Sequence, residues 1–152
     1  WKDEFYKFNF YFDSFVHKDF NMNNLIFLPK KTNHLKCGIV DFQGAFLGFS
    51  GWDLFSLLED CRIFFTDKYN KEILKYFYNN TYQKISYEEF INQYYFLNTS
   101  RQTRLLGRWI KLDSQLKNKG YLKYMDTTIK RLKTSLLNLN NKKLLKLYSK
   151  IL

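Results

Sequence analysis

The sequence predicts a mostly helical α+β protein in which one small β-hairpin packs on a helical bundle. Two short runs rich in β-branched and aromatic residues, 25–28 and 37–40, flank a polar segment, which is the pattern of a hairpin. After residue 52, apolar residues recur at helical spacing through most of the chain. We expect residues 1–152 to form a single domain.

The elements are expected in the following order. Residues 1–16, rich in Phe and Tyr, are expected to form a short helix or an extended lead-in, with Phe5, Phe8 and Phe12 facing the domain. Asp53 or Ser50 is expected to cap the first long helix, and Ser86 begins a sequence with the form of a capping box. The expected helices are 52–65, 68–79, 86–97, 101–116, 121–139 and 142–152, with a loop at 79–80 and a break at 119–120.

The charge is uneven along the chain. Residues 101–152 hold fourteen Lys or Arg against two Asp, whereas residues 1–100 are nearly neutral. A basic helical tail could bind nucleic acid or an anionic membrane surface. Lys-rich solvent faces beside a Leu stripe are the favoured explanation, and no nucleic-acid motif is present, so the sequence disfavours nucleic acid. No apolar run approaches the ~20 residues of a membrane span, and we expect a cytoplasmic protein without a membrane partner. The sequence leaves the oligomeric state open.

Four polar residues around the predicted hairpin form a pattern suited to phosphoryl transfer. His17, Asp19 and Asn24 give H-x-D-x-x-x-x-N, and Asp41 begins D-F-Q after an apolar run. This is nearly the catalytic signature of kinases. A carboxylate can orient an acceptor hydroxyl and take its proton, while carboxylate and amide oxygens suit magnesium. The predicted hairpin lies between Asn24 and Asp41 in the sequence, and a hairpin brings its two ends together. We therefore expect Asp19, Asn24 and Asp41 to meet at one end of a small sheet.

A resemblance to a known family follows from these residues. It is carried by 17–24, by Ile39-Val40-Asp41-Phe42-Gln43, and by Gly48 with 52–60. These stretches resemble the aminoglycoside phosphotransferase and choline kinase family of the protein-kinase-like fold. A later segment, 101–107 with Tyr121-Leu122, is similar to the bacterial kinases of N-acetylmuramate and N-acetylglucosamine.

The resemblance implies roles for individual residues. It implies that Asp19 is the catalytic base, that Asn24 and Asp41 bind Mg²⁺ beside ATP, and that His17 and Asp53 support the loop. Gln43 stands where protein kinases have the Gly of D-F-G, which argues against a protein kinase. Lys18 stands where the family often has Gly or Arg.

The implied activity is transfer of the γ-phosphoryl group of ATP to a small-molecule hydroxyl, with an amino sugar as the expected acceptor. An aminoglycoside or choline is an alternative acceptor. No G-x-G-x-x-G loop is present, so the chain is expected to be the carboxy-terminal catalytic lobe without the ATP-gripping lobe. A non-catalytic half-kinase module whose basic tail binds an anionic partner is the alternative from another class.

The acceptor-binding residues are left open by the sequence. Arg101, Arg104 and Arg108 lie on one face of an expected helix, where guanidinium groups could hold a carboxylate or phosphate. A solvated or salt-bridged role explains the same spacing.

Overall fold

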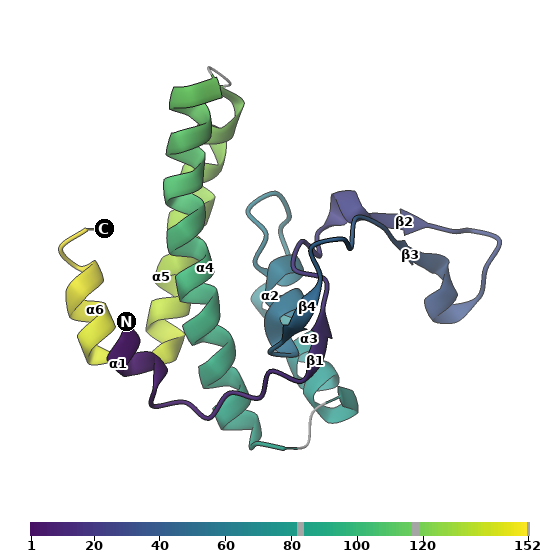
Figure 1. The fold of residues 1–152 in the computed structure, drawn as a ribbon, viewed down its shortest axis with the longest axis horizontal. Helices are drawn as coiled ribbons and strands as arrows, with labels where there is room; N and C mark the ends of the chain where they lie inside the picture. The colour runs from purple at the N-terminus through teal and green to yellow at the C-terminus, as the bar shows by residue number, and fades with distance from the viewer. Residues whose placement is uncertain (82–83, 117–118, 152) are drawn as a thin grey trace.

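The computed structural model describes residues 1–81, 84–116 and 119–151. Within them the chain runs through six α-helices, three short 3₁₀ helices and four three-residue strands. Figure 1 shows the long helix α4 beside α5, with α6 on one side and a hairpin projecting on the other. The expectation of a mostly helical protein with a small β component is confirmed.

The helices begin and end as follows: α1 Lys2–Phe5, α2 Gly51–Leu58, α3 Asp67–Thr81, α4 Tyr87–Leu116, α5 Met125–Leu139 and α6 Lys142–Tyr148, with 3₁₀ turns at Met22–Asn24, Asn33–Lys36 and Lys119–Tyr124. The strands are β1 Ser14–Val16, β2 Leu25–Phe27, β3 Cys37–Ile39 and β4 Phe46–Gly48. Among the described residues they pair as two separate antiparallel sheets, β1 with β4 and β2 with β3.

One helix, α4, replaces the two that were expected over 86–97 and 101–116. Asn98 and Thr99 lie in the gap between the two expected helices, and both are fully buried within α4. Asn98 Nδ2 donates to Ser135 Oγ of α5 at 2.7 Å, and Thr99 Oγ1 donates to the Tyr95 carbonyl at 2.7 Å. The Asn98 hydrogen bond joins α4 to α5, and the Thr99 hydrogen bond lies within α4. At its start, Ser86 Oγ accepts from the Glu89 amide at 3.1 Å, which confirms the predicted cap.

Two other boundaries differ from expectation, and a third agrees with it. Helix α2 ends at Leu58, and Phe64, predicted on its buried stripe, is 77% exposed. Helix α3 continues through the predicted loop at 79–80, with Asn80 donating to the Tyr76 carbonyl one turn back. The predicted break at 119–120 is confirmed as a change from α4 to a 3₁₀ helix, although 117–118 lie outside the described residues.

The core lies among the helices. It joins Phe49 and Phe55 near α2 to α3, α4, α5 and α6, and consists of Phe49, Leu54, Phe55, Leu58, Leu74, Phe90, Tyr94, Phe96, Leu97, Leu132, Leu136, Leu139, Leu144 and Tyr148. The amino-terminal segment runs along this core in Figure 1, with Phe5 and Phe8 packed against it. Phe12, predicted to face the domain with them, is instead 50% exposed, because helix α1 ends at Phe5 and the following chain is extended.

The predicted hairpin forms at the expected place, as strands β2 and β3. It projects from the bundle and does not pack on it, as Figure 1 shows. Its strands are three residues long, and Phe27 and Ile39 are 72% and 48% exposed. In the chain order β1 precedes the hairpin and β4 follows it, and the sheet that they form was not predicted.

Candidate active site

The loop after β1 is held by Asp53 of α2. Asp53 Oδ2 accepts from the His17 amide at 2.7 Å, and its Oδ1 accepts from the Lys18 amide at 3.0 Å. Burial raises the pKa of Asp53, and the two backbone hydrogen bonds oppose that rise. The predicted cap of α2 by Asp53 is therefore wrong, because this carboxylate supports the loop. Ser50 stands at the capping position without a side-chain hydrogen bond to the helix.

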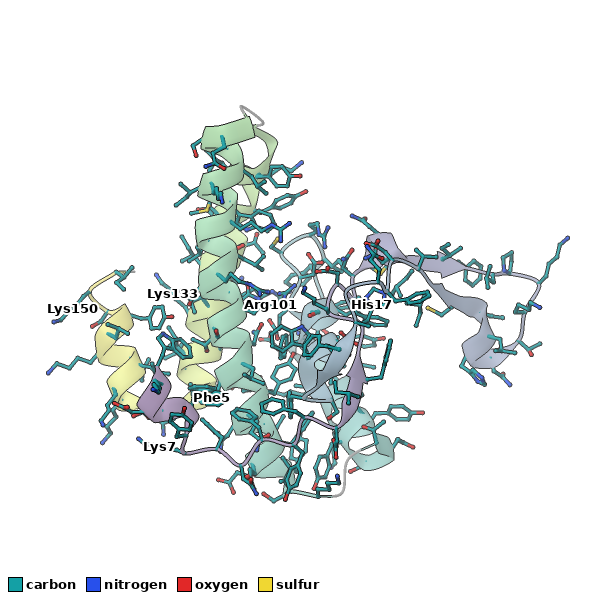
Figure 2. The ribbon with its side chains drawn as sticks, in the orientation of Figure 1. Phe5, Lys7, His17, Arg101, Lys133 and Lys150 are labelled. Atoms are coloured by element: carbon teal, nitrogen blue, oxygen red, sulfur yellow. The ribbon has the colours of Figure 1, made fainter. Side chains whose placement is uncertain are left out.

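His17 ties the same loop to the end of the hairpin. The buried His17 ring lies near the junction of β1 and the loop in Figure 2. Its Nε2 lies 2.8 Å from the Val40 carbonyl oxygen, and since a carbonyl can only accept, Nε2 is the protonated nitrogen. Val40 immediately precedes Asp41, so His17 positions that residue through the backbone.

The structure brings Asp19, Asn24 and Asp41 together, as the spacing predicts. Asn24 Nδ2 donates to the Asp19 carbonyl oxygen at 2.9 Å and lies 3.4 Å from Asp41 Oδ2. Gln43 Nε2 donates to the other Asp41 oxygen at 2.8 Å. Asn21, which the sequence did not single out, also donates to the Asp19 carbonyl, at 2.8 Å. One amide side chain therefore links both halves of the motif.

Two residues of the site have left-handed backbone conformations. Lys18 has a φ of 77° and Asp41 a φ of 68°. Asp tolerates this region better than most residues, whereas Lys rarely adopts it. Such conformations persist where the surrounding contacts impose them, and they concentrate at functional sites. The hydrogen bonds from Asp53 and His17 supply those contacts here.

The oxygen donors fit a magnesium ion. Asn24 uses its amide nitrogen for both hydrogen bonds above, and its Oδ1 accepts none from the residues that the structure describes. Within those residues no group of three His, Cys, Asp or Glu side chains could hold a metal. A carboxylate and an amide oxygen nevertheless suffice for Mg²⁺ when phosphate oxygens and water complete its shell.

These residues open onto a cleft of about 370 Å³. Its lining joins the loop after β1 and the hairpin base to α2, α4 and the 3₁₀ turn before α5, and comprises Lys18, Asp19, Phe20, Asn21, Asn23, Asn24, Asp41, Ser56, Arg62, Arg101, Arg104, Leu105, Arg108, Trp109, Leu112 and Tyr121. The cleft therefore includes all three arginines of the 101–108 face. Arg62, Trp109 and Tyr121 were not predicted as site residues. The fold brings them into the same cleft as Asp19.

Comparison with known proteins assigns the class. A family model described as the phosphotransferase enzyme family (APH) matches residues 12–87, half of the chain, and this range contains every motif residue above. The chain belongs to the phosphotransferase enzyme family.

One relative is similar over a shorter stretch. The N-acetylmuramate/N-acetylglucosamine kinase of Caulobacter vibrioides is 44% identical over 48 residues, which is 32% of this chain and 13% of that kinase. The matched stretch thus represents a small part of the relative's length. Among the described residues, no helix is long and apolar enough to cross a membrane.

Proposed function

We propose that this protein transfers the γ-phosphoryl group of ATP, with Mg²⁺, to a hydroxyl of an amino sugar of the N-acetylmuramate or N-acetylglucosamine type. The observation that carries the proposal is the Asn24 side chain, which hydrogen-bonds the Asp19 backbone at 2.9 Å and approaches the Asp41 carboxylate at 3.4 Å in one cleft. The Asp19 carboxylate and two oxygen donors suited to a metal line the same cleft, which supports the proposal.

Asp19 is the proposed general base. Its carboxylate is exposed to the cleft and has no hydrogen-bond or ion-pair partner among the described residues. It would accept the proton of the acceptor hydroxyl as the hydroxyl oxygen bonds to the γ-phosphorus. The bond from that phosphorus to the β,γ-bridging oxygen breaks, and ADP leaves with the electron pair.

Asn24 and Asp41 are the proposed metal ligands. A bound Mg²⁺ would neutralise charge on the nucleotide phosphates. Gln43 orients the Asp41 carboxylate through the 2.8 Å hydrogen bond to Oδ1. His17 and Asp53 act as positioning residues, because they touch the loop backbone and not the cleft.

The amino sugar is favoured over two other acceptor classes. The relative named above supports it by its 44% identity over 48 residues. Aminoglycosides and choline are cations, and four arginines line the cleft, so like-charge repulsion disfavours both. The chain lacks a G-x-G-x-x-G loop, and we propose that it forms the catalytic lobe of a protein-kinase-like fold whose ATP-gripping lobe lies outside these 152 residues.

The test uses the protein in the form that its natural source makes, with its intact mass measured first. Phosphorylation of N-acetylmuramate, N-acetylglucosamine, an aminoglycoside and choline is followed with Mg·ATP. We expect transfer to an amino sugar, and a loss of about 10²–10⁴-fold in Asp19→Asn, the usual contribution of a general base. The circular dichroism spectrum of the variant should match the wild type.

Other outcomes separate the alternatives. Near-normal turnover in Asp19→Asn would contradict the role of Asp19 as base. A mass matching this chain, together with no transfer to any acceptor, would favour the half-kinase module whose basic tail binds an anionic partner.

A further inference from the structure

Four guanidinium groups converge on the side of the cleft opposite the hairpin. Arg101, Arg104 and Arg108 come from successive turns of α4, and Arg62 comes from the turn after α2. Figure 2 shows Arg101 reaching from α4 toward the neighbouring elements. Its Nη2 lies 3.4 Å from the Ser56 carbonyl oxygen of α2. The arginines therefore face into the cleft and not along the outer surface of α4.

Arg62 is already neutralised by a neighbour. Its Nη2 and Nε atoms donate to the two carboxylate oxygens of Asp60 at 2.6 and 2.9 Å. Burial alone would raise the pKa of Asp60, but the hydrogen bonds and charge of Arg62 outweigh burial, and the pKa of Asp60 is lowered. Asp60 and Arg62 thus neutralise each other, and Arg62 offers little net positive charge to a ligand.

The charges of the α4 arginines are not compensated in this way. Arg101 Nη1 is buried without a hydrogen-bond partner, and burial lowers the pKa of Arg101. Arg104 and Arg108 are exposed to the cleft, and no residue that the structure describes forms an ion pair or hydrogen bond with either guanidinium. Like charges held close together are unfavourable unless an anion joins them. The cluster therefore presents uncompensated positive charge that an anionic group could neutralise.

The position of the cluster points to the acceptor and not to the nucleotide. Asn24 and Asp41, the proposed ligands of the nucleotide's metal ion, lie at the base of the hairpin, and α4 lies apart from the hairpin in Figure 1. Beside Arg108, Trp109 stacks on Tyr121 with ring centroids 5.5 Å apart and planes 12° apart. Aromatic walls with a few oriented polar groups are typical of small-molecule sites. A sugar could therefore bind at this wall with a hydroxyl near Asp19.

We propose that Arg104 and Arg108 are specificity-determining residues that bind an anionic group, a carboxylate or a phosphate, carried by the acceptor. The inference rests on the proposed function, because that function identifies the acceptor as a sugar. An arginine fork pairs with carboxylate or phosphate through two parallel hydrogen bonds. Of the two sugars named for the relative, N-acetylmuramate carries a carboxylate and N-acetylglucosamine does not. The site then favours the acidic sugar.

The test compares binding of matched anionic and neutral sugars by calorimetry, without nucleotide. The probes are N-acetylmuramate, its methyl ester, N-acetylglucosamine and N-acetylglucosamine 6-phosphate. We expect an anionic sugar to bind at least about tenfold more tightly than its neutral counterpart, corresponding to about 1.4 kcal/mol. Whether the carboxylate or the phosphate gives the gain identifies the anion.

Variants assign the effect to the two arginines. The double variant Arg104→Gln/Arg108→Gln should erase the preference for the anion, so that each anionic sugar binds no more tightly than its neutral counterpart. Lys111→Gln is the matched control, because Lys111 is exposed on the same helix and does not line the cleft. It should retain the preference.

Several results would overturn the inference. These are the absence of anion-dependent binding in the wild type, its persistence in the double variant, and a loss of Mg·ATP affinity in place of sugar affinity. Its failure is distinguishable from failure of the proposed function. Anion-dependent binding without phosphoryl transfer would refute the function alone, and equal transfer to acidic and neutral sugars would refute the inference alone.

Discussion

The hairpin region and the helical bundle are built differently. The loop after β1 and the hairpin of β2 and β3 carry Asp19, Asn24 and Asp41, yet they expose large apolar side chains such as Phe27 and Ile39 to solvent. The bundle buries a continuous aromatic and aliphatic core around Phe55. Among the described residues, the links between the two regions include the hydrogen bonds that Asp53 accepts and the paired strands β1 and β4.

The difference implies that most of the stability resides in the bundle, whereas the proposed catalytic and metal-binding residues reside in the hairpin region. Apolar burial is the main favourable term in folding, and it lies almost wholly in the bundle. The proposed catalytic and metal-binding residues instead depend on a few hydrogen bonds and two left-handed residues. Substitutions in the apolar core of the bundle should therefore change folding, and substitutions of Asp19 or Asp41 should change chemistry.

The largest expected effect is on stability, in a matched pair of phenylalanines. Phe55 is fully buried and Phe27 is 72% exposed. Phe55→Ala should lower the free energy of unfolding by about 3–5 kcal/mol, the usual cost of removing a buried phenyl group. Phe27→Ala should change it by about 0.5 kcal/mol or less, as is usual for surface positions. Urea denaturation measures both, and equal losses would show that the hairpin shares the core.

The next effect is on metal use. Asp41→Ala should weaken Mg²⁺ activation by more than the ~10–100-fold that loss of an outer partner of a metal site causes. Asp41→Asn is the control for backbone strain, because Asn tolerates the left-handed region that Asp41 occupies and Ala does not. Both variants should lose magnesium response in a titration of rate against Mg²⁺. An unchanged magnesium dependence in either would remove Asp41 from the proposed ligands.

The two regions also differed in how far the sequence could predict them. Asp19, Asn24 and Asp41 could be placed together because a short hairpin leaves few ways to arrange its two ends. Their contacts through Asn24 agree with that expectation. The exposure of the hairpin could not be predicted, because a short apolar strand has the same sequence whether or not a partner covers it.

In the bundle, the sequence predicted two helices where the structure has one. The polar residues Asn98 and Thr99 of the predicted gap lie inside α4, where Ser135 of α5 supplies a partner for Asn98. The arginine face of α4 was visible from its spacing. Its position in the cleft beside Trp109 depends on tertiary packing that no local pattern encodes. In both examples, a residue on another helix or strand determines where the polar side chain lies.

A smaller effect concerns the contact between α1 and α6. Glu4 accepts from Lys7 Nζ at 2.7 Å and from Asn141 Nδ2 at 2.6 Å, and these hydrogen bonds, that of Lys7 first, lower its pKa from 4.5 to about 2. As pH falls, the Glu4 carboxylate therefore binds a proton at a higher pH in the unfolded chain than in the folded protein. Stability from Glu4 should be complete above pH 4.5 and be lost as pH falls toward about 2.

The measurement for Glu4 is denaturation of wild type and Glu4→Gln as a function of pH. The difference between them should shrink through this acidic range. Fluorescence should report the release of α1, because Trp1 lies 5.1 Å from Phe96 of the core between ring centroids. A difference that does not change with pH would mean that ionisation of Glu4 does not hold α1 in place.

The smallest expected effect tests strain in the hairpin region. Lys18 has a φ of 77°, and its amide donates to Asp53. Lys18→Gly and Lys18→Ala both remove the side-chain charge, but only Gly adopts this backbone conformation without steric cost. The Gly variant should be more stable than the Ala variant by about 1 kcal/mol or less, since the greater freedom of Gly in the unfolded chain offsets part of the relief. If the two variants unfold at the same urea concentration, Lys18 is not strained, and the site is as relaxed as the bundle that supports it.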